Sequence, residues 1–142
     1  MSASNETELV ACLNQRQFKS LIYRESDWLI TLDNNMTVMI ECLWRLIDAG
    51  RVKWTSLDHD QWFGLSAPVD AAAEVNKRIA GHVVKRVELR AGTLDLELYF
   101  DHGFSFQVIP YSGSYEAWNV DGPSGWFIAT GGGDLKRVRK GN

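Results

Sequence analysis

The 142-residue chain is long enough to bury the core of one domain, and its 45% hydrophobic and 23% charged residues are ordinary for a globular protein. A net charge of −3 is small and has the wrong sign for a general nucleic-acid binder. No apolar run approaches the roughly 18 residues of a membrane span, and the start lacks the pattern of a signal peptide. We therefore expect a cytoplasmic protein in which Cys12 and Cys42 are reduced, buried thiols.

The first half of the chain predicts a short helix followed by strands. Ser4 can cap a helix whose apolar stripe is Leu9, Cys12 and Leu13. Alternating apolar residues then predict strands that are separated by turns at 33–35 and 48–50. These strands are expected at 18–24, 28–32, 36–47 and 52–55.

The second half predicts the same kinds of element in the same order. Asp70 can cap a helix that ends near Ala80-Gly81, where glycine suits a left-handed C-terminal position. The clearest pattern is a hairpin from Leu94 to Val108, which turns at 101–103. Further strands are expected at 83–89, 115–120 and 126–129, followed by a basic tail at 134–142 that we expect to be frayed.

The two halves match element for element, which predicts an internal duplication. The match aligns Leu9 with Val75, and Trp54 with Trp118. The predicted fold is α+β, with a single domain over 1–142 that contains pseudo-repeats at about 4–65 and 70–133. Each repeat would hold a short helix and about five mostly antiparallel strands, and the two would pack around a pseudo-twofold axis. The alternative is two runs of generic strands, since alternating strands resemble one another by chance.

Asp58-His59-Asp60 is the one histidine that acidic residues flank on both sides. A metal site needs several converging ligands, which neighbouring residues on a strand cannot supply, so we expect neither a metal nor a cofactor. His59 is therefore predicted to be a turn or surface residue. The enzymatic alternative is a hydrolase-type site, with His59 as general base, Asp58 or Asp60 orienting it, and Glu116 as a second carboxylate.

Several residues that break the symmetry of the repeats are candidates for binding, and Trp118 is added because it would share a strand face with Glu116. Tryptophan, tyrosine and arginine are the usual anchors of protein interfaces. One hypothesis is an ion pair between Arg45 and Glu116 that joins the repeats; the favoured alternative is that Trp118 is a core residue and Glu116 is solvated. The candidate binding residues are Trp44, Arg45, Asp58, His59, Gln61, Tyr115, Glu116 and Trp118.

Several local patterns, taken together, resemble those of a family of small bacterial proteins of unknown function. The matching segments are Trp44-Arg45, 58–65, 98–101, 115–118 and 131–133, and the resemblance extends from about Leu13 to Leu135. It implies no activity and no catalytic residue. By size and fold style the chain is also similar to immunity proteins, which neutralise bacterial toxins; that similarity is an analogy.

Three functional hypotheses follow from the sequence. The first is a non-catalytic, immunity-type module with a toxin-like protein partner. The second is a small-molecule binder with a tryptophan-lined cleft between the repeats. The third is the hydrolase-type enzyme that uses His59. No nucleic-acid or membrane partner is expected, and a homodimer is an open alternative because strand edges are available for pairing.

Overall fold

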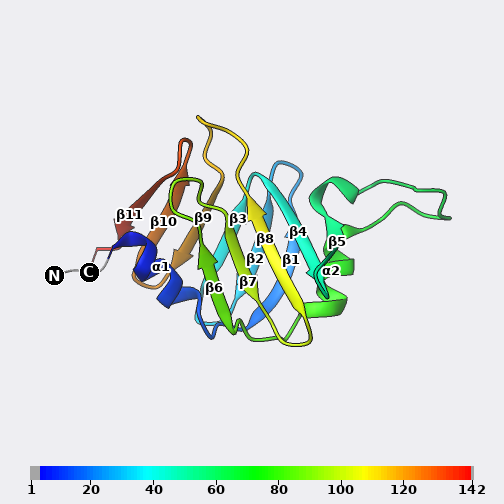
Figure 1. Cartoon of the computed structure of the whole chain (residues 1–142), viewed down its shortest axis with the longest axis horizontal. Coiled ribbons are helices and arrows are strands. Elements are labelled where there is room, and N and C mark those ends of the chain that lie inside the picture. Colours follow the sequence, from blue (N-terminus) through cyan, green and yellow to red (C-terminus); the bar gives the residue numbers. More distant parts are fainter. Residues whose placement is uncertain (1–3, 142) are drawn as a thin grey trace.

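Two facing β-sheets form the body of the protein, in a computed structural model that describes residues 4–141 (Figure 1). In chain order the elements are α1 (Asn5–Leu13), β1 (Phe18–Tyr23), β2 (Trp28–Leu32), β3 (Thr37–Ile40), β4 (Leu43–Asp48), β5 (Arg51–Thr55), the 3₁₀ turn η1 (Ser56–Asp58), α2 (Ala71–Ile79), β6 (Arg86–Leu89), β7 (Leu96–Tyr99), β8 (Phe104–Ile109), β9 (Trp118–Gly122), β10 (Gly125–Thr130) and β11 (Asp134–Arg139). The prediction of a mostly antiparallel α+β fold is confirmed at this level.

Each half of the chain contributes strands to both sheets. The first sheet has the order β1-β2-β3-β9-β10-β11, and the second has the order β5-β4-β8-β7-β6. In the first half, the chain passes from the first sheet to the second at Glu41–Cys42, within the range 36–47 where one long strand is predicted from the sequence. That prediction is wrong because β3 pairs with β9 and β4 pairs with β8, so the chain changes sheets between them.

The predicted turns are confirmed by their backbone angles. Asn34 and Asn35 have φ values of 57° and 55°, and His102 and Gly103 have values of 64° and 79°. Asparagine and glycine adopt this left-handed region more easily than other residues do. Local sequence therefore determines where these hairpins reverse.

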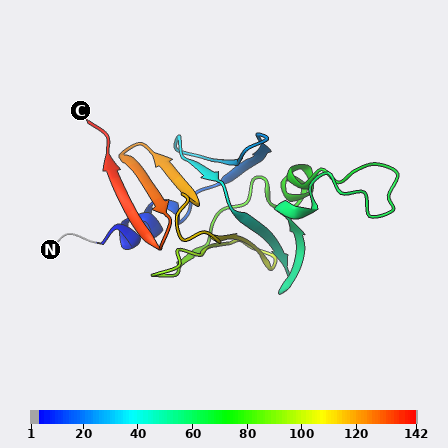
Figure 2. The same cartoon turned by 90° about the horizontal axis from the view of Figure 1, so that it is seen from above.

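The two helices close the two open sides of the sandwich (Figure 2). Helix α1 contacts the edge strands β6 and β11, and α2 contacts the edge strands β1 and β5. Ser4 and Asp70 cap the helices as predicted, each accepting a backbone N–H in the first turn. Asn76 of α2 also makes two hydrogen bonds with the backbone of Leu21 on β1, of 2.8 and 2.9 Å, so the helix covers that strand edge.

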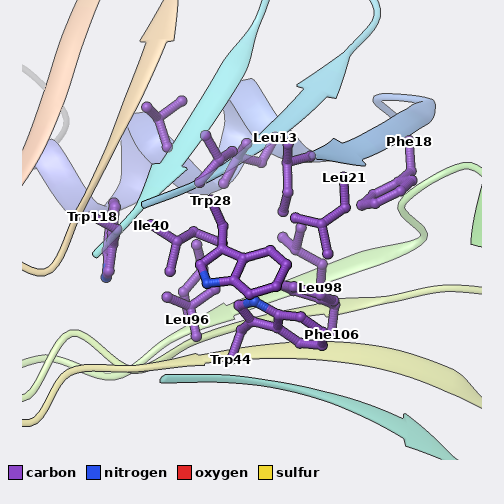
Figure 3. Packing of buried hydrophobic residues seen from close by; sticks show 14 of the residues in the cluster. Leu13, Phe18, Leu21, Trp28, Ile40, Trp44, Leu96, Leu98, Phe106 and Trp118 are labelled. Carbon is purple, nitrogen blue, oxygen red and sulfur yellow. The ribbon is translucent and has the colours of Figure 1, made fainter. Parts of the chain in front are cut away.

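The core lies between the sheets and is rich in aromatic rings (Figure 3). Trp28 of the first sheet meets Trp44 of the second nearly edge-on, with ring centroids 5.1 Å apart. Trp44 in turn stacks on Phe106 at 5.2 Å. Cys42 is buried, but Cys12 is only half-buried, so the prediction of two buried thiols is right for one of them.

The C-terminal segment is a strand rather than a frayed tail. Residues 134–139 form β11, which pairs with β10 along its whole length and buries Leu135. The prediction failed because most side chains of this strand are charged and leave no apolar alternation. Just before β11, Gly131 and Gly133 lie so close to the backbone of Ser114 and Gly92 that neither position has room for a Cβ atom.

The strand pairings of the two halves can be compared residue by residue. Trp28 pairs with Ile40 as Leu96 pairs with Val108. Ile40 then pairs with Trp118, as Val108 pairs with Trp44. Trp118 is thus paired across its sheet as Trp44 is, whereas Trp54, which the sequence aligns with Trp118, pairs with Leu46.

Candidate functional site

A long loop between η1 and α2 extends away from the sandwich (Figures 1 and 2). We call residues 59–70 the projecting loop. Three apolar side chains at its tip are more than half exposed, at 56% for Trp62, 64% for Phe63 and 55% for Leu65. Clustered exposed apolar side chains mark interaction sites more often than isolated ones do.

The tip is a tight turn with a strained aromatic residue. The N–H of Leu65 donates to the carbonyl of Trp62 at 2.7 Å, and the two central residues, Phe63 and Gly64, have φ values of 46° and 74°. Two positive φ values are typical of a type I′ turn, whose first central position favours asparagine, aspartate or glycine. Phenylalanine at this position costs stability and presents its ring to solvent.

The base of the projecting loop is held by several hydrogen bonds. The carboxylate of Asp58 accepts from the N–H of Thr55 at 2.9 Å and completes a capping box on η1. The N–H of Asp60 donates to the carbonyl of the buried Val69, whose own N–H donates to Gln61, both at 2.8 Å. The loop is therefore attached firmly to the body, which reduces the entropy lost when its tip binds.

His59 contributes to this anchoring. Its Nδ1 accepts the N–H of Ala71 at 3.2 Å, and its ring lies against Tyr23 and Trp28, with centroids 4.5 and 5.2 Å away. Its Nε2 is 3.6 Å from an oxygen of the exposed Asp60. His59 thus connects the projecting loop to α2 and to the first sheet.

The structure brings Asp58, His59 and Gln61 together at the loop base, and it places Tyr115 on an exposed loop before β9. The side chains of Asp58 and His59 both accept hydrogen bonds from backbone N–H groups. Among residues 4–141, neither His59 nor Asp58 forms a hydrogen bond or ion pair with Glu116, the second carboxylate of the enzymatic alternative.

Trp44 and Trp118 are core residues, not binding residues. Both are completely buried, because their strands point these side chains between the sheets. The indole N–H of Trp118 donates to the carbonyl of Leu94 at 3.0 Å, whereas that of Trp44 has no partner among the described residues. The rings of Trp44 and Trp118 are therefore part of the packed core between the sheets.

The hypothesised ion pair between Arg45 and Glu116 is not present among the ion pairs of residues 4–141. Arg45 lies on the outer face of the second sheet and donates to the amide oxygen of Gln107. Glu116 lies before β9 of the first sheet and accepts from Asn119 at 3.2 Å. The two residues do not meet because Arg45 lies on β4 of the second sheet, whereas Glu116 lies just before β9 of the first sheet.

A polar network that the sequence analysis did not single out covers the outer face of the second sheet. Glu97 accepts hydrogen bonds from Ser105 at 2.7 Å and from Gln107 at 3.1 Å, and Tyr99 donates to Glu88 at 3.0 Å. The alternation of polar residues along β7 was the available signal. A groove of about 250 Å³ beside Glu97 and Arg45 is open to solvent.

Burial, followed by the neighbouring carboxylates Glu97 and Glu88, raises the pKa of Tyr99 to about 12. An unfolded tyrosine titrates near pH 10, so the folded state keeps a proton that the unfolded state loses. Stability should be independent of this group below about pH 10 and should fall as the pH rises toward 12. Ultraviolet titration of tyrosinate should show one late phenol among the four tyrosines, and Tyr99→Phe should remove it. A late phenol that persists in Tyr99→Phe would contradict this assignment.

Among residues 4–141, no three histidine, cysteine or acidic side chains are arranged to hold a metal ion. No helix in the same range is long and apolar enough to cross a membrane.

Comparison with known proteins agrees with the resemblance drawn from the local motifs. A family model described as Family of unknown function (DUF6188) matches residues 20–139. The match includes both sheets and the projecting loop. No curated protein and no solved structure matches the chain.

Proposed function

The chain belongs to the Family of unknown function (DUF6188), and we propose that it is a non-catalytic protein-binding module. The observation that carries this proposal is the exposed, strained Phe63 between Trp62 and Leu65 at the tip of the projecting loop. Strained residues cluster where proteins bind or react, because selection for function outweighs their cost. A firmly held aromatic tip is suited to fill an apolar pocket on a partner.

The charge around the tip supports a protein with a basic surface as the partner. Residues 56–70 contain Asp58, Asp60 and Asp70 and no lysine or arginine. Cytoplasmic membrane surfaces are anionic and attract basic segments, so this charge disfavours a lipid surface. An immunity-type role, in which the loop occupies a toxin-like protein, is the most specific form of the proposal.

The test compares three tagged proteins as baits in a lysate of the source cells. The tip variant is Trp62→Ser/Phe63→Ser/Leu65→Ser, and the control variant is Ile22→Ser/Val52→Ser, which removes exposed apolar side chains elsewhere. Wild type and control should capture the same stoichiometric protein, and the tip variant should not. With that protein purified, the tip variant should bind at least about 100-fold more weakly, or about 2.7 kcal/mol.

Capture of the partner by all three baits, or by none, would contradict the proposal. Sedimentation with vesicles that contain phosphatidylserine, lost in the tip variant, would identify a membrane ligand instead. Because the three tip side chains are exposed, their replacement should leave the unfolding midpoint of the protein nearly unchanged.

We also propose that the fold arose by internal duplication, which supplies the scaffold for the loop. Its support is that β1-β2-β3 followed by β4-β5 repeats as β6-β7-β8 followed by β9-β10, with each pair crossing to the opposite sheet. In this alignment the segment after β5 carries the projecting loop, while the segment after β10 leads directly into β11. The loop is therefore an addition to one half only.

A further inference from the structure

A pocket of about 300 Å³ opens at the base of the projecting loop, and we call it the η1 pocket. Apolar side chains that line it come from β2, the start of β4, η1 and the loop after β8, and they include Trp28, Leu43, Leu57 and Tyr111. Its acidic residues are Glu25, Asp27 and Glu41. In Figure 1 the segments that form it meet at the upper edge of the sandwich, on the side where the loop emerges.

The negative charge of this pocket is only partly balanced within the protein. Arg24 holds Asp27 with two hydrogen bonds of 2.7 and 2.9 Å. Glu25, Glu41 and the nearby Glu116, by contrast, form no ion pair with any residue in 4–141. Partial burial, followed by the charges of Glu116 and Asp27, raises the pKa of Glu41. The pocket thus combines carboxylates with apolar lining, and no cation of residues 4–141 pairs with Glu25 or Glu41.

A lysine or arginine side chain has the chemistry that this arrangement lacks. Its aliphatic stem can lie on apolar and aromatic surface while its charged head reaches carboxylates. The ring of Tyr111, which is 74% exposed, can also attract a cation over its face. An anionic ligand would meet repulsion from every charged residue that lines the pocket.

We infer that the η1 pocket seats a basic side chain of the protein partner, with its stem against Trp28 and Leu57 and its head beside Glu25 and Glu41. This inference rests on the proposed function, because it adds a second contact to the interface that the projecting loop anchors. Leu57 joins the two contacts, since it lines the pocket and lies just before the loop. The apolar tip would supply most of the binding area. The pocket would favour partners that have a basic residue beside the surface to which the tip binds.

The test uses small probes, so it does not depend on knowing the partner. Nα-acetyl-arginine amide is titrated into the full-length, ¹⁵N-labelled protein while the backbone amide shifts are followed by NMR. Amides of Glu41, Leu43 and Leu57 should shift with a dissociation constant in the millimolar range. The isosteric, neutral Nα-acetyl-citrulline amide should cause no saturable shift.

Two variants locate the binding. Glu41→Gln should weaken binding of the arginine probe at least tenfold, whereas Glu88→Gln, a carboxylate on the outer face of the second sheet, should leave it unchanged. Equal shifts with citrulline, no shift with arginine, or no loss in Glu41→Gln would overturn the inference. Tighter binding of putrescine than of the arginine probe would also overturn it, by assigning the pocket to a free amine.

The tip variant separates the inference from the proposed function. Trp62→Ser/Phe63→Ser/Leu65→Ser leaves the η1 pocket intact and should bind the arginine probe as wild type does. If the probe binds but the tip variant still captures the protein partner, the proposed function fails alone. If the tip variant loses the partner but no protein form binds the probe, the inference fails alone.

Discussion

Replacing Trp118 with phenylalanine is expected to destabilise the protein by about 2 kcal/mol more than the same replacement of Trp44. The two tryptophans are both fully buried and have equivalent places in the pairing of β9 and β4. They differ in one hydrogen bond. The indole N–H of Trp118 donates to the carbonyl of Leu94 at 3.0 Å, whereas the indole N–H of Trp44 is buried without a partner among the described residues.

The difference follows from what each substitution leaves behind. Trp118→Phe leaves the carbonyl of Leu94 unpaired inside the protein, and a buried unpaired polar group costs about 1–3 kcal/mol. The lost bond also supports Leu94, which has a positive φ of 61°. Trp44→Phe instead removes a buried donor that has no partner among the described residues. The stability gained in this way offsets part of the stability that is lost with the smaller side chain. Both changes to alanine should cost about 3–5 kcal/mol, because each leaves a large cavity.

Urea unfolding of the four variants measures these differences, with an unchanged m-value as evidence that the native state keeps its compactness. Equal losses for Trp118→Phe and Trp44→Phe would mean that the bond to Leu94 contributes nothing, or that Trp44 has a partner in solution. A smaller loss at Trp118 than at Trp44 would contradict the assignment of the two environments.

The sequence could predict elements and turns but not the sheet to which each strand belongs. Ser4, Asp70 and the asparagine and glycine residues at turns act through local backbone geometry, so their signals are readable within a few residues. The crossing at Glu41–Cys42 has no glycine or proline to mark it. It depends on β3 pairing with β9, about 80 residues later in the chain, and such pairing leaves no local pattern.

The candidate site was only partly predictable for a related reason. Residue type alone does not distinguish a tryptophan that anchors an interface from one that fills a core, so Trp44 and Trp118 were among the binding candidates although both are buried. Burial depends on which face of a strand points inward, and that is set by the sheet arrangement. Asp58, His59 and Gln61, which were among the candidates, lie at the loop base, and the side chains of Trp62, Phe63 and Leu65 beyond them carry the exposed apolar surface. The sequence signal for these exposed side chains was the pair Phe63-Gly64, which stands in a segment without the apolar alternation of a strand.

Phe63→Asn should raise stability and reduce binding, and this opposition is the sharpest consequence of the proposed function. The substitution creates Asn-Gly, the pair that a type I′ turn favours, so it should stabilise the fold by about 0.5–1 kcal/mol. The midpoint of thermal unfolding should rise by about 2–4 °C for a chain of this size. Calorimetry of the purified variant provides the measurement.

The same variant removes the aromatic side chain that we place in the partner's apolar pocket, so its affinity should fall at least about tenfold, or about 1.4 kcal/mol. Leu65→Asn is the matched control, because it removes an exposed apolar side chain from the same turn at a residue without a positive φ. It should weaken binding without raising the melting temperature. A Phe63→Asn protein that is more stable and binds normally would show that the strain has no role in recognition. One that is less stable would show that the ring of Phe63 supports the fold.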